Sequence, residues 1–126
     1  MSVVMDTNAL MMPVECDVRV FEELERLVDA TELLVPEAVL DELAKLADGT
    51  SEEAAAASVG LDLVRERCRA VPHEADYADD AVLEVGERDE VTHAVTNDGP
   101  LQRRLLAAGV PVISLRARNK LAVTQS

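Results

Sequence analysis

The sequence predicts a single α/β domain, in which a parallel β-sheet is covered by helices on both faces. Short apolar runs alternate with longer segments of helical periodicity from one end of the 126-residue chain to the other. The apolar runs are nearly continuous, which is typical of strands that are buried on both faces. No repeat, low-complexity segment or linker interrupts this order. We therefore expect one domain over residues 1–126.

The expected strands are short apolar runs bounded by polar or turn-forming residues. They are residues 2–5, 33–35, 68–71, 91–96 and 112–115. The first run ends at Asp6-Thr7-Asn8, which we expect to form a turn.

The expected helices are the segments in which apolar residues recur at helical spacing. They are residues 17–28, 36–47, 50–67, 76–88 and 101–108. Pro36 suits the first turn of the second of these helices, and Gly109 suits the end of the last one. Thr50 and Glu53 have the spacing of a capping box, which predicts where the third helix begins.

The charge of the chain is strongly negative and unevenly distributed. Asp and Glu number 25 against 12 Lys and Arg, for a net charge of −13. A surplus of surface carboxylate with little lysine suits a protein that works in concentrated salt, so we expect a halophilic source. Residues 99–126 contain five basic residues and no acid, which makes a basic C-terminal end on an acidic body.

Several protein classes are excluded by the composition. No apolar run approaches the roughly 18–20 residues of a membrane span, and Asp6 ends the first apolar run too early for a signal peptide. Cys16 and Cys68 lack the spacing of zinc ligands and fit buried thiols of an intracellular protein. We therefore expect a cytoplasmic domain without a membrane partner.

Acidic residues are expected to meet at one edge of the sheet. Asp6 and Asp98 each follow an apolar strand, and open α/β sheets bind ligands at the carboxyl ends of their strands. Glu42 lies on the margin of the apolar stripe of its helix, so its carboxylate can reach inward. Asp41 points almost opposite to that stripe and is expected to face solvent.

Another helix adds two acids in its first turn, Asp79 and Asp80, and periodicity does not choose between them. Crowded carboxylates raise each other's pKa unless a cation lies among them. A ligand set made only of oxygen favours Mg²⁺ or Mn²⁺, and such an ion can activate water for phosphodiester hydrolysis. His73 and His93 fit ordinary polar or packing roles.

Four short segments follow one another in a recognisable order. They are Met5-Asp6-Thr7-Asn8, Val35-Pro36 through Glu42-Leu43-Ala44-Lys45-Leu46, Tyr77-Ala78-Asp79-Asp80 and Thr96-Asn97-Asp98. In this order and at this spacing the chain resembles the PIN-domain ribonucleases over nearly its whole length. The resemblance is greatest to the small-subunit processome (Fcf-like) branch and its archaeal relatives. That branch shares the Tyr-Ala-Asp-Asp run and a Leu101-Gln102-Arg103-Arg104 segment leading to Gly109-Val110-Pro111-Val112.

The resemblance implies a three-layer sandwich with a central five-stranded parallel sheet. It also implies a Mg²⁺- or Mn²⁺-dependent endoribonuclease, with ribosomal RNA processing as a role. The implied catalytic and metal-binding acids are Asp6, Glu42, Asp80 and Asp98, and the implied auxiliary groups are Asp79, Asn8 and Thr96. Asp80 is preferred to Asp79 because the family acid usually has an aliphatic residue three places on, here Leu83. Val82 stands at the same distance from Asp79.

Other functions fit the same fold. A VapC-type toxin would share the chemistry and bind an antitoxin, and a non-catalytic module would only bind RNA or a ribosome-assembly partner. Met11, Met12 and Pro13 suit either a homodimer contact or core packing. A haloacid-dehalogenase phosphatase needs a second Asp where Asn8 stands, and a receiver domain needs an acidic pair and a late Lys that do not fit.

RNA binding by so negative a body must depend on the metal and on phosphate contacts from the basic C-terminal end. The expected contact residues are Arg103, Arg104, Arg116, Arg118 and Lys120. With one Tyr, one Phe and no Trp, the chain offers no aromatic platform for stacking bases. We therefore expect recognition of RNA shape and backbone.

Overall fold

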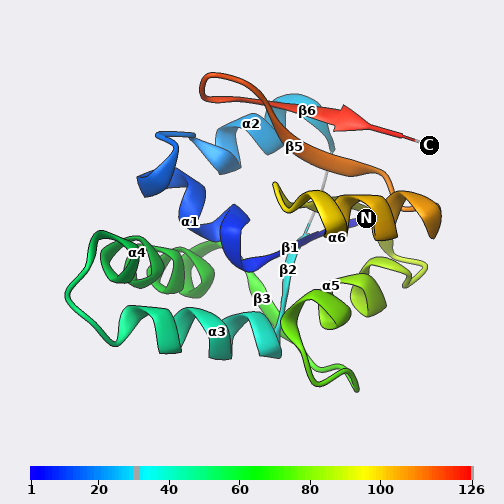
Figure 1. Cartoon of the computed structure of the whole chain (residues 1–126). Helices are drawn as coiled ribbons and strands as arrows, with labels where there is room; N and C mark the ends of the chain where they lie inside the picture. Colours follow the sequence, from blue (N-terminus) through cyan, green and yellow to red (C-terminus); the bar gives the residue numbers. More distant parts are fainter. Residues whose placement is uncertain (30–31, 126) are drawn as a thin grey trace.

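A central sheet forms the middle layer of the protein, which a computed structural model describes over residues 1–29 and 32–125 (Figure 1). Across the described residues this sheet has six strands in the order β3-β2-β1-β4-β5-β6. The strands are β1 (Ser2–Met5), β2 (Glu32–Pro36), β3 (Arg69–Val71), β4 (Val91–Val95), β5 (Val112–Ala117) and β6 (Lys120–Thr124). The α/β sandwich that the sequence predicts is therefore confirmed.

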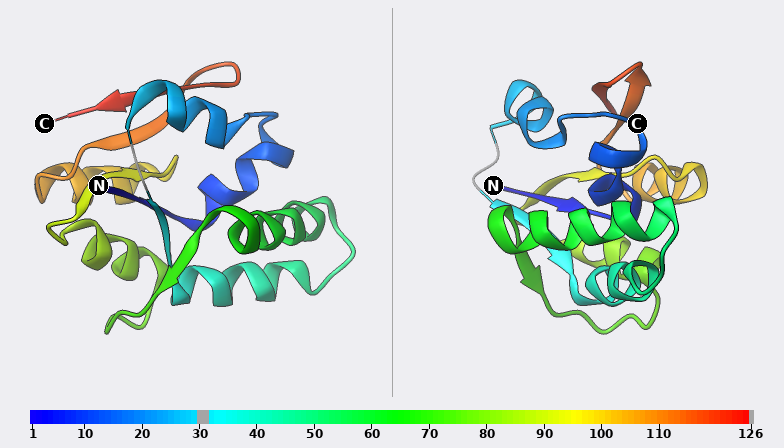
Figure 2. Two further views of the ribbon diagram at one scale, coloured as in Figure 1. Left: turned by 180° about the vertical axis from the view of Figure 1, so that it is seen from behind. Right: turned by 90° about the vertical axis from the view of Figure 1, so that its left-hand side faces the viewer.

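The helices form two groups around this sheet. They are α1 (Thr7–Glu15), α2 (Val20–Leu27), α3 (Glu37–Ala47), α4 (Glu52–Arg67), α5 (Ala78–Gly86) and α6 (Gly99–Ala107). α1 packs against α2, α3 and α4, whereas α5 packs against α6 and against β1, β2 and β4. Both chain ends lie on the same side of the molecule, away from the α3–α4 turn (Figures 1 and 2).

The sheet is not five-stranded, as the resemblance implied, because a sixth strand follows the last predicted one. β1 to β5 are parallel, and β6 turns back to pair with β5 in antiparallel register. Asn119, with φ 52°, lies in the turn between them, in the left-handed region that asparagine tolerates. Leu121 is the one fully buried residue of β6, and the charged and polar residues around it break the apolar pattern that would predict a strand.

Residues 6–8 do not form a turn, because Asp6 caps a helix that begins at once. Its carboxylate accepts a hydrogen bond from the Ala9 amide at 2.8 Å, which satisfies a free donor in the first turn of α1. Met11 and Met12 on this helix are 4% and 1% exposed. They pack in the core, so they do not form the exposed dimer contact that the sequence left open.

Four predicted helix starts shift by two or three residues, among them that of α6, which begins at Gly99 rather than at residue 101. α2 begins at Val20, because Asp17 takes a left-handed conformation with φ 53°. α4 is capped by Ser51, whose hydroxyl accepts from the Ala54 amide at 3.1 Å, and not by Thr50. α5 begins at Ala78 rather than at residue 76.

The core lies on both faces of the central strands. Val3, Val4 and Met5 of β1 have no exposed surface, as expected for a strand covered from both sides. Cys16 and Cys68 are free thiols, and burial raises the pKa of Cys68 to about 11. Over the described ranges, no helix has the length and apolar character needed to cross a membrane.

Candidate active site

Asp6 is a buried carboxylate at the carboxyl end of β1. Only 4% of the residue is exposed, although aspartate is almost never buried unless it is paired. One carboxylate oxygen accepts from the Ala9 amide at 2.8 Å, and the other accepts from the Thr96 hydroxyl. Both donors are neutral, so Asp6 has hydrogen bonds but no cation within these contacts.

Thr96 joins Asp6 to a second acid. It has no exposed surface, and its hydroxyl oxygen also accepts from the Asp98 amide at 3.0 Å. Asp98 in turn caps α6, with its carboxylate accepting from the Leu101 amide at 2.9 Å. The ends of β1 and β4 are thus held together by one hydroxyl group.

Amide side chains fix the rest of this strand end. The Asn8 side chain accepts from the Asn97 amide at 3.0 Å, and the Asn97 side chain accepts from the Leu115 amide at 2.8 Å. The Gln102 side chain donates to the Thr96 carbonyl at 3.0 Å. Asn8 and Thr96, expected as auxiliary groups, therefore position backbone and carboxylate atoms around Asp6 and Asp98.

The acids surround a pocket of about 220 Å³, which we call the acid pocket. Its lining is Asp6, Thr7, Asn8, Met11, Glu15, Glu42, Leu46, Glu53, Asp79 and Asp98. Six of these ten residues are acids. Two of them follow strands β1 and β4, and the other four lie on α1, α3, α4 and α5. The predicted convergence of acids at one sheet edge is what the structure shows for Asp6, Glu42 and Asp98.

Of the four acids that the resemblance implied, Asp80 does not line the acid pocket. Asp79, which the resemblance ranked below Asp80, lines it instead. Asp80 lies outside the lining, and its carboxylate accepts from the Arg104 guanidinium at 2.7 Å. The two residues are adjacent in the first turn of α5, so their side chains point about 100° apart. Only the packing of α5 against α3 and α6 decides which of them faces the pocket.

Sequence reasoning missed Glu15 and Glu53, which lie on the outer part of the pocket. Glu15 ends a helix whose first residues lie in the segment 6–8 that was expected to be a turn, and Glu53 was interpreted as part of a capping box. Gly60 allows α4 to pack closely against α1, since a Cβ atom at this position would meet the Leu10 carbonyl oxygen at 3.0 Å. A small residue in the middle of α4 was the one available signal of this close contact.

Burial and like charges both disfavour ionisation in the acid pocket. Burial raises the pKa of Asp6 to about 7; the Thr96 and Ala9 hydrogen bonds oppose this shift, and the charges of Asp79 and Asp98 add to it. Partial burial also raises the pKa of Asp79, together with the charges of Asp98 and Glu42. A cation in the pocket would relieve this repulsion.

The donors present fit a divalent cation that keeps much of its water. Thr7 lines the pocket, and its buried hydroxyl has no hydrogen-bond partner among the described residues. Within the same ranges, no three Asp, Glu, His or Cys side chains lie close enough to hold an ion alone. Mg²⁺ is commonly held by one or two carboxylates plus several waters, which suits this arrangement.

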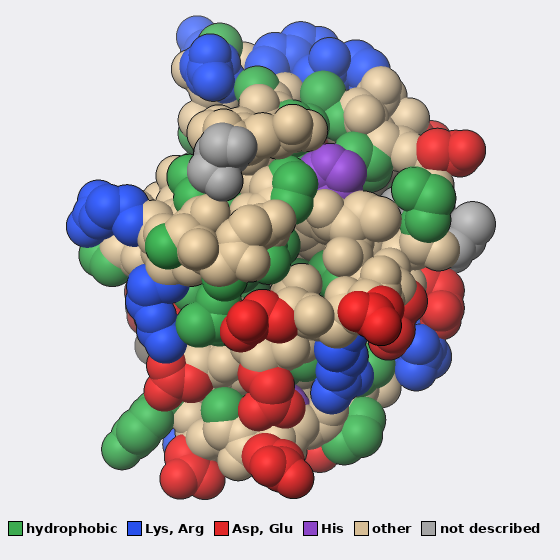
Figure 3. All heavy atoms as spheres, turned by 90° about the vertical axis from the view of Figure 1, so that its right-hand side faces the viewer, with side chains coloured by type: hydrophobic (Ala, Val, Ile, Leu, Met, Phe, Trp, Pro, Cys, Tyr) green, Lys and Arg blue, Asp and Glu red, His purple; other side chains and the backbone are tan. Residues whose placement is uncertain are grey.

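The five expected RNA contacts come from two parts of the fold, α6 and the β5–β6 hairpin. Arg104 pairs with Asp80, and the Lys120 ammonium lies 3.7 Å from Glu23. Arg116 and Arg118 are exposed near the β5–β6 turn, and Arg103 is exposed on α6. Figure 3 shows Lys and Arg side chains at the top and along the left edge of this face, with others among the Asp and Glu side chains that lie mainly in its lower half.

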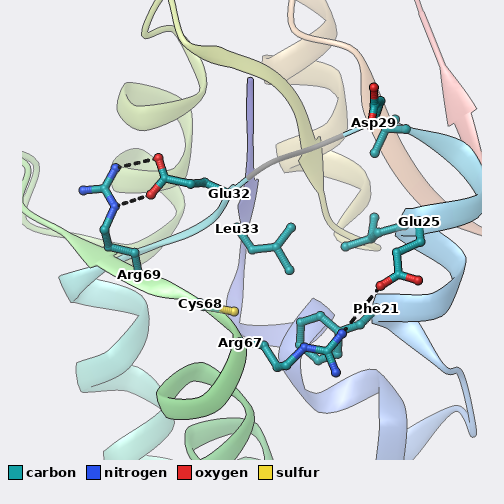
Figure 4. A pocket seen from close by; sticks show the side chains of 10 residues that line it. Phe21, Glu25, Asp29, Glu32, Leu33, Arg67, Cys68 and Arg69 are labelled. Carbon is teal, nitrogen blue, oxygen red and sulfur yellow. Dashed lines mark hydrogen bonds and ion pairs between the residues drawn. The ribbon is translucent and has the colours of Figure 1, made fainter.

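A larger pocket, of about 420 Å³, lies between α2, β2 and β3 (Figure 4). Four of its five charged side chains form two ion pairs. Arg69 binds Glu32 at 2.6 Å, and Arg67 lies 3.8 Å from Glu25 and over the Phe21 ring. None of the six acids of the acid pocket lines it, so size alone does not identify the reactive site.

Comparisons with known proteins agree with this architecture. A family model described as a PIN like domain matches residues 3–118. Ribonuclease VapC4 of Methanocaldococcus jannaschii is 27% identical over 120 residues, covering 92% of this chain and 91% of the relative. The structure of the PIN domain endonuclease Utp24 matches with a TM-score of 0.80 and 26% identity, over 99% of this chain and 92% of that one. A domain of a functionally unknown protein from the same Methanocaldococcus species shares the fold, with a TM-score of 0.65, 21% identity, and coverage of 92% and 91%.

Proposed function

Because this chain belongs to the PIN-like domain family, we propose that it is an endoribonuclease that depends on Mg²⁺ or Mn²⁺. The observation that carries the proposal is the buried Asp6 and the half-buried Asp98, joined through Thr96 at the carboxyl edge of the sheet. Two similar proteins, VapC4 and Utp24, are named as nucleases, which supports a nuclease function for this chain.

The proposed metal-binding acids are Asp6, Glu42, Asp79 and Asp98. Asp79 replaces Asp80 in this set because Asp79 lines the acid pocket whereas Asp80 is paired with Arg104. Asp80 then acts indirectly, since its ion pair holds Arg104 beside the first turn of α5. The unpartnered Thr7 hydroxyl adds a neutral oxygen toward a bound cation or its water.

A bound Mg²⁺ or Mn²⁺ supplies water activation and charge compensation for the phosphodiester. The Ala9 amide and the Thr96 hydroxyl fix the orientation of the Asp6 carboxylate, and the Leu101 amide fixes that of Asp98. Attack by water leaves a 5′-phosphate and a 3′-hydroxyl at the cut. Products ending in a 2′,3′-cyclic phosphate would instead indicate attack by the 2′-hydroxyl of the RNA.

RNA reaches the acid pocket across the carboxyl edge of the sheet. β4 and β5 are parallel, so Asp98 after β4 and Arg116 near the end of β5 lie toward the same edge. Arg116 and Arg118 are exposed and form no ion pair with another described residue. We assign them, with Arg103, to phosphate contacts; Arg104 and Lys120 remain weaker candidates because each is near an acid.

The biological role we favour is ribosomal RNA processing in a halophilic archaeon. The structural similarity to Utp24 and the net charge of −13 support this role and source. The similarity to VapC4 supports the second candidate, a toxin ribonuclease with an antitoxin partner. A non-catalytic RNA-binding module is the third, and it predicts RNA binding without cleavage.

The test is cleavage of total and ribosomal RNA in concentrated KCl with Mg²⁺ or Mn²⁺. We expect metal-dependent cleavage by the wild type and none by Asp98→Asn. Asp89→Asn is the matched control, because Asp89 is exposed and lies outside the acid pocket. Equal activity of the wild type and Asp98→Asn would contradict the proposal, and binding of uncut RNA by both would support the non-catalytic module.

A further inference from the structure

A second pocket adjoins the acid pocket and shares one of its walls. It encloses about 210 Å³ and is lined by Ala38, Asp41, Glu42, Lys45, Asp76, Tyr77 and Ala78. We call it the tyrosine pocket. Glu42 lines both pockets, so a chain bound at one of them passes directly to the other.

Tyr77 is exposed without a structural reason. It is 74% exposed, and as the N-cap residue of α5 it makes no side-chain capping hydrogen bond. Its backbone carbonyl accepts from the Ala81 amide at 2.9 Å, an interaction that does not depend on the ring. An exposed aromatic side chain two residues from Asp79 offers a flat apolar face at the rim of the site.

Besides Tyr77, Ala38 and Ala78, the tyrosine pocket is lined by charged side chains that are free to contact a ligand. Asp41 and Asp76 are exposed, as is Lys45, and none of them forms an ion pair within the described ranges. Carboxylates only accept hydrogen bonds, so with Glu42 they present acceptors around the ring. Three acids against one lysine repel a phosphate and suit a neutral group that carries N–H donors.

We propose that the tyrosine pocket binds the base of a nucleotide next to the scissile phosphate, and that it prefers a base with an amino group. This inference rests on the proposed ribonuclease function. The base stacks on Tyr77, and its donor edge faces the carboxylates of Asp41 and Asp76. The Lys45 ammonium contacts the adjoining phosphate.

The donor pattern of the bases sets an order of preference. Guanine offers two neighbouring N–H groups to one carboxylate, and adenine and cytosine each offer an amino group. Uracil offers one N–H between two carbonyl oxygens, which carboxylates repel. From the sequence we expected no aromatic platform for stacking bases. The single Tyr nevertheless lines this pocket, where it can stack on one base.

Mapping the cut sites in a randomised single-stranded RNA tests the preference directly. With Mn²⁺ in concentrated KCl, we expect guanine to be enriched and uracil depleted at one fixed position beside the cut. Tyr77→Ala should remove this bias and lower kcat/KM by roughly 5- to 150-fold, the range of one lost base–aromatic stack. Tyr77→Phe should keep both, because phenylalanine also stacks.

Val59→Ala, which truncates an exposed side chain on α4, is the control for general effects of losing apolar surface. Asp41→Asn and Asp76→Asn should weaken the guanine bias, because an amide group adds a donor. Cleavage without a base preference, or an unchanged preference in Tyr77→Ala, would overturn the inference.

The emission of the single Tyr, in a chain without Trp, provides a readout that needs no cleavage. We expect GMP to quench Tyr77 emission more strongly than UMP, after correction with N-acetyltyrosinamide for absorbed light. Because GMP and UMP carry the same charge, the difference reports the base alone. Quenching by GMP in a protein that cuts no RNA would retain the base pocket and reject the ribonuclease function. Equal quenching by GMP and UMP, alongside active cleavage, would reject only the base pocket.

Discussion

Asp6 and Glu23 are both buried carboxylates, but their surroundings differ in sign. They are 4% and 7% exposed. Glu23 accepts from Arg26 at 2.9 Å and from the Leu121 amide at 2.9 Å, with the Lys120 ammonium 3.7 Å away. Asp6 accepts only from a neutral amide and a neutral hydroxyl, and it faces other acids.

The difference separates a carboxylate whose charge is compensated by nearby cations from one whose charge is not. The Arg26 hydrogen bonds, with the Leu121 amide and the two nearby cations, lower the pKa of Glu23 to about 2. Burial raises the pKa of Asp6 to about 7. Glu23 connects α2 to β6, and Arg26 and Lys120 compensate its charge. Asp6 has no such cation beside it, and a bound metal ion could compensate its charge.

The largest expected effects come from Asp6→Asn, which should lower RNA cleavage and raise the stability of the fold. We expect RNA cleavage to fall by more than about 100-fold, since even groups that support metal ligands are worth 10–100-fold. At neutral pH the free energy of unfolding should rise by more than about 1 kcal/mol. Each unit of raised pKa corresponds to about 1.4 kcal/mol against the ionised folded state, and the amide carries no charge. Cleavage assays and denaturant titrations check the two effects; a loss of stability would contradict our account of Asp6.

A metal ion should stabilise the wild type through the same carboxylate. At about 100 times its dissociation constant, Mn²⁺ should add about 2.7 kcal/mol to the free energy of unfolding. Asp6→Asn should lose most of this gain, whereas Glu23→Gln should keep it. Thermal melts with and without Mn²⁺ measure the difference, and an equal shift in all three proteins would place the metal elsewhere.

Glu23→Gln should destabilise the fold by roughly 1–3 kcal/mol at neutral pH, because it weakens a charged hydrogen-bond network at a buried position. The lowered pKa makes the contribution of Glu23 fully present above its ordinary value of 4.5, and it is lost as the pH falls toward about 2. The gap between wild type and variant should therefore close across that range. Denaturant titrations at several pH values test this, and a gap that grows on acidification would refute it.

The smallest expected effect concerns the hairpin that Glu23 anchors. Replacing Arg116 and Arg118 by alanine should weaken RNA binding and reduce the salt dependence of log Kd by about 0.7 for each lost phosphate contact. Arg65→Ala is the control, since Arg65 is exposed on α4 beside Asp62. Binding isotherms at several KCl concentrations give the slopes, and equal slopes would exclude the hairpin from the RNA path.

The sequence predicts the five parallel strands well, because each contains a short group of apolar residues, most clearly in β1, where Val3, Val4 and Met5 are fully buried. It misses α1 and β6 for local reasons. Asp6-Thr7-Asn8 has the composition of a turn, but the Asp6 carboxylate caps a helix that begins at the next residue. β6 has one buried anchor, Leu121, and depends on the Glu23 contact from a distant helix.

The candidate site divides in the same way. Asp6 and Asp98 follow strands, so sheet topology alone brings them together, and Glu42 follows from helical phase. The choice between Asp79 and Asp80 depends on how α5 rotates against its neighbours, which no local pattern encodes. Glu53 and Tyr77 reach the site only through the tertiary packing of α3, α4 and α5.

The β5–β6 hairpin also affects how the protein behaves at high concentration. β5 has six residues, and without β6 its outer backbone groups would be open to pairing with other chains. β6 covers that edge and begins at Lys120, and its pairing with β5 has a register shift between Leu115 and Ala117 of β5. The opposite edge is β3, only three residues long. Both ends of the sheet are thus poor templates for aggregation, a useful property in concentrated salt, where charge repulsion between molecules is screened.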